Sequence, residues 1–175
     1  MSILKVARMG HPVLRQRTKP LDKNDLRNSA VQKFMDDMIE TMYEYHGVGL
    51  AAPQVHEGLA IFVAMLDEEP TESSEATVFV NPVIVPASDK TVEGWEGCLS
   101  IPDIRGMVPR HVSITLKALD RQGKPVELPL RDFPARVAQH ETDHLNGVLF
   151  FDRMTSMESL TFIDEFTRYH AKDSD

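Results

Sequence analysis

The chain has 175 residues, 42% of them hydrophobic and 26% charged, and its formal net charge is −8. This length and apolar content predict one domain with one core, and the acidic balance argues against general affinity for nucleic acid or anionic membranes. The chain has no apolar run long enough to span a membrane and does not open on a secretory signal. We therefore expect a cytoplasmic protein, although an organelle location stays open if a transit segment was removed. The single cysteine also suits a reducing compartment.

The first elements to be expected are a helix and two strands. Apolar residues recur at helical spacing over 31–45, and Gly47 should end that helix. Its methionines are expected to fill the core. Strands are predicted over 59–65 and 77–85, and the acidic stretch 67–75 between them is typical of a solvated loop.

The second half predicts a hairpin and two helices. Strands over 112–119 and 125–130 flank a turn, and a helix follows over 133–145. Thr155, with Glu158 three residues later, predicts a capping box for a last helix. Its apolar positions are Met157, Leu160, Ile163 and Phe166. The expected fold is a single compact α+β domain over residues 1–170, with antiparallel or mixed strands around a central helix, an N-terminal and a C-terminal helix, and a frayed tail over 171–175.

The predicted central helix carries the motif His140-Glu141-Thr142-Asp143-His144. Positions i and i+4 share one helix face, so His140 and His144 can bind one metal ion while Glu141 lies beside its open position. This arrangement is typical of metal-assisted hydrolysis. A solvated helix face is the alternative.

Cys98, in the run Glu96-Gly97-Cys98-Leu99-Ser100, offers a third ligand. A lone cysteine is most often a buried, inert residue. Together with two imidazoles, however, a thiolate makes an N2S set that leaves one tetrahedral position for water. Gly97 would let the backbone pass close to that centre.

A third segment, residues 47–54, contains Gly47, Gly49 and Gln54. The glycines permit close approach of a ligand, and the amide of Gln54 can donate to a developing oxyanion. The alternative is a helix C-terminal glycine followed by a tight turn.

In this order the three segments resemble the motifs of the peptide deformylases, G-x-G-x-A-A-x-Q, E-G-C-x-S and H-E-x-D-H, at 47–54, 96–100 and 140–144. The resemblance covers residues 3–155. Three motifs in order are far more specific than any one of them. The resemblance implies a metal-dependent hydrolase that removes the formyl group from the N-terminal formylmethionine of new polypeptides and releases formate.

The resemblance also implies a role for each site residue. The metal ligands would be Cys98, His140 and His144. Glu141 would act as the general base and then as the general acid, while the Gln54 amide and the Leu99 N–H stabilise the oxyanion. The expected substrate contacts are Gly47, Val48, Gly49, Gly97, Arg105, Phe133 and Val137. For Arg105 the alternative is a surface arginine. Arg136 stands where many relatives carry an apolar residue, so the sequence does not determine whether that wall of the pocket is apolar.

The expected cofactor is one divalent metal ion. An N2S site accepts Zn²⁺, Fe²⁺, Co²⁺ or Ni²⁺, and affinity alone favours zinc. The resemblance implies Fe²⁺ as the native ion. The expected partners are formylmethionyl ends of nascent chains, with only weak ribosome contact because 156–175 is acidic. Neither a specific nucleic acid nor a membrane partner is expected.

Two other functions fit parts of the sequence. One is a zinc peptidase of the H-E-x-x-H type, against which the single cysteine and the Gln-bearing loop count. The other is a binding module stapled by a structural metal, which would usually need a fourth protein ligand. The unassigned histidines are expected on the surface or satisfied in the core; they are His46, His56, His111 and His170.

Overall fold

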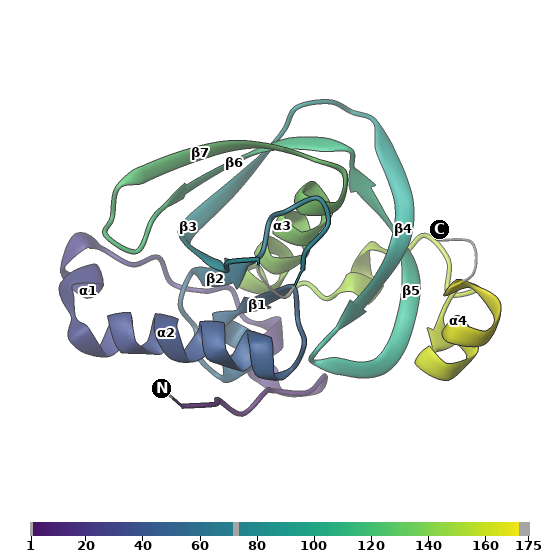
Figure 1. The fold of residues 1–175 in the computed structure, drawn as a ribbon, viewed down its shortest axis with the longest axis horizontal. Coiled ribbons are helices and arrows are strands. Elements are labelled where there is room, and N and C mark those ends of the chain that lie inside the picture. The colour runs from purple at the N-terminus through teal and green to yellow at the C-terminus, as the bar shows by residue number, and fades with distance from the viewer. Residues whose placement is uncertain (1, 72–73, 172–175) are drawn as a thin grey trace.

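The computed structural model describes residues 2–71 and 74–171, in which two antiparallel sheets lie around one helix, α3 (Asp132–Leu145) (Figure 1). The larger sheet has the order β1 (Gly49–Ala51), β2 (Ile61–Ala64), β3 (Thr77–Pro86), β6 (Ser113–Leu119) and β7 (Pro125–Arg131). The smaller one has the order β4 (Thr91–Cys98), β5 (Ile101–His111) and β8 (Thr161–Phe162). The α+β prediction is confirmed.

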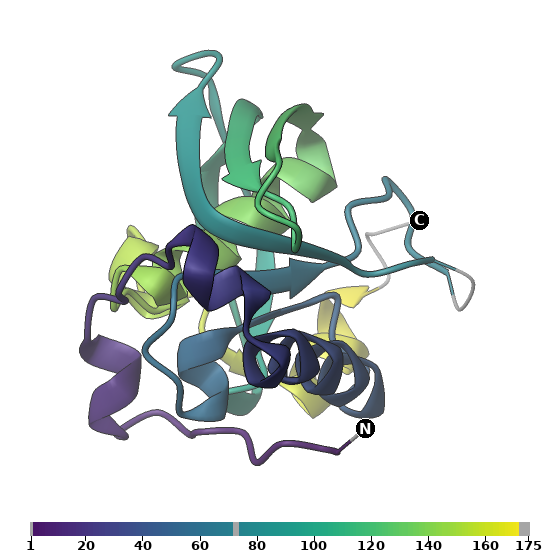
Figure 2. The same ribbon diagram turned by 90° about the vertical axis from the view of Figure 1, so that its left-hand side faces the viewer.

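The predicted N-terminal helix is α2 (Ser29–Glu44), which packs against β1 and β2 and follows the short α1 (Lys23–Arg27) (Figure 2). It begins where the Asn28 side chain accepts a hydrogen bond from the Ala30 N–H at 2.9 Å. As expected from the sequence, its methionines fill the core; Met35, Met38 and Met42 are fully buried. Short 3-10 turns lie at Pro12–Arg15, Ala52–Val55 and Phe150–Arg153.

The strands predicted over 59–65 and 77–85 are β2 and β3, and the predicted hairpin is β6 and β7. The Asp120 carboxylate closes the hairpin turn by accepting hydrogen bonds from the N–H groups of Gln122 and Lys124. The described part of the acidic stretch, 67–71 and 74–75, has no regular secondary structure. Residues 72–73 of that prediction lie outside the described residues.

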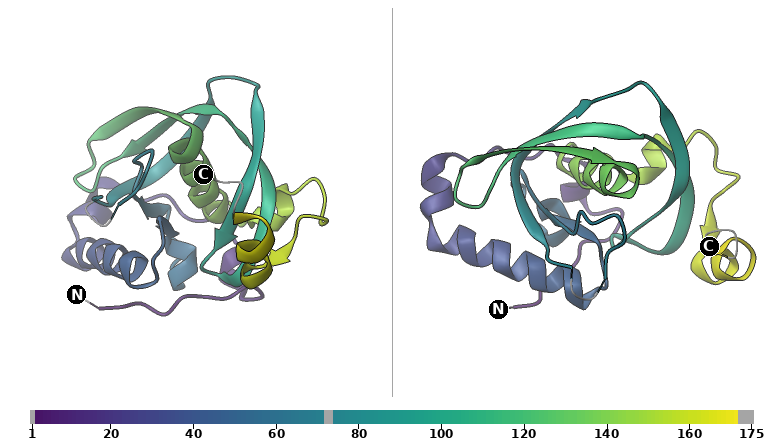
Figure 3. Two further views of the ribbon diagram at one scale, coloured as in Figure 1. Left: turned by 45° about the vertical axis from the view of Figure 1, so that its right-hand side comes forward. Right: turned by 45° about the horizontal axis from the view of Figure 1, so that its top comes forward.

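Helix α3 has two kinds of neighbour (Figure 3). On the larger sheet, the small side chains of Ala135 and Ala138 pack in a cluster with Phe62 and Phe79. Toward the smaller sheet, α3 presents charged side chains to β4 and β5. The helix ends before Gly147, whose φ of +73° is one that glycine adopts readily. The site is therefore built where α3 meets both sheets.

The prediction for the C-terminal helix is wrong in its start. The Thr155 hydroxyl donates to Glu93 at 3.2 Å and makes no capping box with Glu158. Strand β8 comes first, because its backbone pairs with the open edge of β5, and α4 (Ile163–Tyr169) follows. Of the tail predicted to fray, 172–175 lie outside the described residues. None of the described helices has the length and hydropathy needed to cross a membrane.

Candidate metal centre

Three buried side chains meet between α3 and the end of β4. His140 and His144 lie one turn apart on α3, and Cys98 is the last residue of β4. Their ligand atoms all lie within 4.8 Å of one another; Cys98 Sγ is 3.3 Å from His144 Nε2, which is 3.2 Å from His140 Nε2. In a tetrahedral site with bonds of about 2.0–2.3 Å, ligand atoms are roughly 3.3–3.6 Å apart. The spacing and the N2S donor set therefore fit one divalent ion.

The two imidazoles differ in what holds them. The Nδ1 of His140 lies 2.8 Å from a Glu96 carboxylate oxygen, which leaves Nε2 turned toward the other two ligand atoms, 3.2 Å from His144 Nε2. Such a carboxylate fixes the tautomer and orientation of a ligand histidine. The Nδ1 of His144 is buried and has no hydrogen-bond partner among the described residues. Glu96, which the sequence did not single out as a site residue, thus orients one of the predicted ligands.

Glu96 is the centre of a buried ionic network. Arg110 donates to both of its oxygens, at 2.9 and 3.0 Å, and Arg136 donates at 2.8 Å. Burial opposes ionisation of Glu96, but the hydrogen bonds with His140 and Arg110 outweigh it and hold its pKa well below the usual range. Arg110 also pairs with Asp143 of the H-E-T-D-H motif. The network fixes α3 to β4 and β5.

Glu141 lies beside the cluster without taking part in this network. It is buried, and its Oε2 has no hydrogen-bond partner among the described residues. A Cβ added at Gly49 would lie 2.4 Å from its Oε1, so only a glycine leaves room for this carboxylate. Burial raises the pKa of Glu141 to about 7, with Glu96 adding to the shift and His140 opposing it. Such a carboxyl can accept and release a proton near neutral pH.

The orientation of Gln54 is fixed by both ends of its amide. Oε1 accepts a hydrogen bond from the Ala51 N–H at 2.8 Å, so Nε2 faces Cys98 Sγ at 3.4 Å and Ser100 Oγ at 3.3 Å. The amide donor therefore lies at the cluster. The helix C-terminal role given as the alternative for Gly47 is also present: its N–H donates to the Met42 carbonyl oxygen at 2.9 Å just after α2, and the chain then enters β1 at Gly49.

A cleft of about 620 Å³ opens beside the cluster. The predicted site residues that line it are Gly47, Val48, Gly49, Gln54, Gly97, Cys98, Leu99, Arg105, Phe133, Val137, His140 and Glu141. The guanidinium of Arg105 lies against Gly97, where an added Cβ would be 1.8 Å from its Nη1. Sequence reasoning missed Lys5, Arg8 and Trp95. The first two belong to an N-terminal segment crossing the cleft edge, a placement that depends on long-range backbone bonds and has no local signal.

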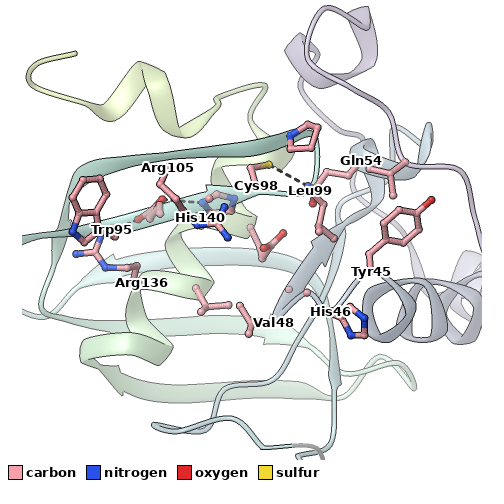
Figure 4. A pocket seen from close by; sticks show the side chains of 18 of the residues that line it. Tyr45, His46, Val48, Gln54, Trp95, Cys98, Leu99, Arg105, Arg136 and His140 are labelled. Atoms are coloured by element: carbon pink, nitrogen blue, oxygen red, sulfur yellow. Dashed lines mark hydrogen bonds and ion pairs between the residues drawn. The ribbon is translucent and has the colours of Figure 1, made fainter. Parts of the chain in front are cut away.

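The guanidinium of Arg136 is hydrogen-bonded to strands β4 and β5. Its guanidinium donates to the carbonyl oxygens of Val92 at 2.8 Å and Val108 at 2.7 Å, as well as to Glu96. The side chain points away from Val48 across the cleft (Figure 4). The pocket wall whose polarity the sequence did not determine is therefore formed by Arg136. Its guanidinium is already hydrogen-bonded to β4 and β5, which leaves the apolar stem of the side chain for the cleft.

The chain matches the family model for polypeptide deformylase over residues 3–160. It belongs to this family. A peptide deformylase 2 of Nostoc sp. is 42% identical over 158 residues, which cover 88% of this chain and 87% of that protein. A peptide deformylase of Stutzerimonas stutzeri is 42% identical over 158 residues, with 90% of each chain covered.

Solved deformylase structures share the fold. A class I type b peptide deformylase from Acinetobacter baumannii, crystallised with Met-Ala-Ser bound, has a TM-score of 0.81 and 40% identity, covering 88% of this chain and all of that one. The enzyme from Thermotoga maritima has a TM-score of 0.81 and 39% identity, covering 89% of this chain and all of that one. The protein is thus a metal-dependent hydrolase that removes the formyl group from nascent chains.

Proposed function

We propose that deformylation takes place in this cleft and that Cys98, His140 and His144 hold one divalent ion there. The observation that supports this most directly is that these three ligand atoms lie together beside the unpartnered carboxylate of Glu141. A bound ion supplies Lewis acidity toward water and the formyl oxygen. We assign the catalytic domain to residues 1–170 and place the enzyme in the cytoplasm.

Glu141 moves the proton. It accepts a proton from water as the water oxygen attacks the formyl carbon, and it returns that proton to the departing amine nitrogen. Its raised pKa, about 7, suits both halves of this transfer. The products are formate and a peptide with a free N-terminal amine.

Two donors stabilise the negative charge that develops on the formyl oxygen. One is Gln54 Nε2, whose orientation is fixed because Oε1 is held by Ala51. The other is the backbone N–H of Leu99, directly after the ligand Cys98. A formyl carbon carries only hydrogen, so a close-packed site can exclude acyl groups that are larger by one methyl.

The peptide binds as an added strand. The backbones of Gly47, Val48 and Gly49 on one side, and of Gly97 on the other, form its hydrogen bonds. The methionine side chain packs against Val48, Phe133, Val137 and the Arg136 stem, and Arg105 donates to a downstream carbonyl. The relative with Met-Ala-Ser bound supports this use of the cleft.

The native ion is Fe²⁺ in this proposal, with Zn²⁺, Co²⁺ and Ni²⁺ as ions the N2S set also accepts. Metal analysis of anaerobically purified protein, together with formate release, tests it. Zinc as the only ion in fully active protein would contradict the iron assignment.

Glu141→Gln tests the catalytic assignment. It keeps the three ligands, so we expect full metal content and a loss of at least about a hundredfold in formate release from formyl-Met-Ala, as for a positioned base. Glu158→Gln, at an exposed carboxylate that does not line the cleft, is the control. Normal turnover by a metal-loaded Glu141→Gln enzyme would remove Glu141 from the mechanism. Cleavage of an internal peptide bond without formate release would instead favour the zinc peptidase.

Ribosome contact through the C-terminal segment is weak in this proposal. The segment 156–175 carries more acidic than basic residues, and phosphate-rich RNA attracts the opposite charge. We expect deletion of 166–175 to leave ribosome co-sedimentation at low salt unchanged. A large, salt-sensitive loss of co-sedimentation would contradict this.

A further inference from the structure

The C-terminal segment, residues 154–171, lies along the β4–β5 hairpin (Figure 1). Its strand β8 extends the small sheet, with Phe162 opposite Ile104 and Thr161 opposite Arg105. Arg105 also lines the cleft. The same residue of β5 is therefore held by the C-terminal segment through its backbone while its side chain faces the substrate site.

Further contacts follow along β5. The Met107 N–H donates to Ser159 Oγ at 3.0 Å. Gly106 lies so close to the segment that an added Cβ would be 2.8 Å from the terminal carbon of Met154. The segment is thus packed against the strand rather than tethered to it at one point.

A ring cluster connects α4 to the cleft. The ring centroids of Phe166 and His170 each lie 5.0 Å from that of Trp95, with interplanar angles of 68° and 44°. Edge-to-face and tilted pairs at this distance are favourable. Trp95 also lines the cleft, so one indole contacts both α4 and the space where the peptide binds.

We propose that the C-terminal segment positions the Trp95 and Arg105 rim of the cleft, with Phe166 and His170 as positioning residues for the peptide beyond its first methionine. The inference rests on the proposed placement of substrate in this cleft. From Thr155 to Ala171, the hydrogen bonds and ring contacts that the segment makes with described residues are with β4, β5 and the segment itself, whereas the proposed methionine pocket is formed by α3 and Val48. Loss of α4 packing should therefore weaken downstream contacts and spare the first residue.

The kinetic test uses the metal-loaded enzyme and three substrates: formyl-Met, formyl-Met-Ala and formyl-Met-Ala-Ser. For Phe166→Ala we expect KM for the longest peptide to rise about three- to tenfold, as the loss of an aromatic pair predicts, with kcat within about twofold. The kinetics of formyl-Met should stay within about twofold. Phe166→Tyr keeps the ring and should restore KM. Tyr169→Ala, whose side chain is 63% exposed on the same helix, is the matched control.

A second measurement reads the rim directly. Trp95 is the only tryptophan of the chain, so fluorescence excited selectively at tryptophan reports its surroundings alone. Phe166→Ala should shift the Trp95 emission, and titration with Met-Ala-Ser should change the emission of the unaltered enzyme. The dissociation constant of that peptide should rise in Phe166→Ala by the same factor as KM.

A double-mutant cycle separates positioning from general stability. If Phe166 acts through Trp95, Phe166→Ala should add little to the effect of Trp95→Ala on the longest peptide. Additive effects, or a KM change that is the same for all three substrates, would overturn the proposal, as would unchanged kinetics. Glu141→Gln tests the site itself: if that variant turns over formyl-Met normally, the proposed site fails whatever the C-terminal variants show.

Discussion

Glu96→Gln tests whether the buried ionic network controls the metal centre. The substitution keeps the side-chain shape but removes the charge that faces His140 Nδ1 at 2.8 Å. Loss of such a partner to a ligand histidine typically weakens metal binding about 10–100-fold, because the ring is less well oriented and a poorer donor. We expect a metal dissociation constant raised by that factor.

The same change should destabilise the metal-free protein. Glu96 and Arg110 are both about 4% exposed at the side chain, so the cation would lose a fully buried partner. Removing one member of a buried pair costs about 3–5 kcal/mol. Arg110 keeps Asp143, and Arg136 keeps the carbonyls of Val92 and Val108. We therefore expect the lower end, a free energy of unfolding reduced by about 3 kcal/mol.

Competition with a chromophoric chelator measures the metal affinity, and urea unfolding of the metal-free protein measures stability. Glu93→Gln, on the exposed part of the same strand, is the control. The reasoning would be refuted by a Glu96→Gln protein whose metal affinity lies within twofold of the unaltered protein and whose stability lies within about 0.5 kcal/mol, the usual range of a surface change.

Two further outcomes are expected. Gly49→Ala would place a Cβ 2.4 Å from Glu141 Oε1 and displace that carboxylate; formate release should fall at least about tenfold with metal content unchanged, and an unaltered rate would show that the carboxylate position is not critical. At Asp152, burial acts to raise the pKa, but hydrogen bonds from Arg15 and the Leu149 N–H hold it below its usual value. This stabilisation is present above about pH 4 and is lost as pH falls through the lowered folded-state pKa. Asp152→Asn should therefore cost about 0.2–1 kcal/mol in urea unfolding at pH 7 and progressively less as the pH falls; an equal cost at every pH would point to packing instead of charge.

Much of the fold follows from local pattern. The stripe over 31–45 and the 133–145 helix have clear periodicity, and the structure places α2 and α3 there. Strands β4 and β5 carry no such signal, because glycines and prolines interrupt their sequences. Residues of both strands also line the cleft as well as forming the smaller sheet. Strand β8 exists only because β5 has an open edge.

The residues of the site also fall into two groups, those that a local motif predicts and those that only the folded chain brings together. The proposed metal ligands and Glu141 lie in short motifs with fixed spacing, so the sequence alone could assemble them as a hypothesis. The partners of Glu96 come from separate elements, Arg110 from β5 and Arg136 from α3, and nothing local joins them. The packing of Trp95 could not be predicted from the sequence either, since its ring neighbours Phe166 and His170 lie some seventy residues later in the chain.

The cluster also couples the two sheets. Cys98 belongs to β4 of the smaller sheet, whereas α3, which carries both histidines, is held to the larger sheet by apolar packing around Ala135 and Ala138. The three ligand atoms meet only if α3 is packed against both sheets at once. Because the unfolded chain lacks this geometry, any free energy gained on binding an ion also stabilises the packing of α3 between the sheets. Metal affinity therefore measures the packing of α3 between the sheets as well as the ligands themselves.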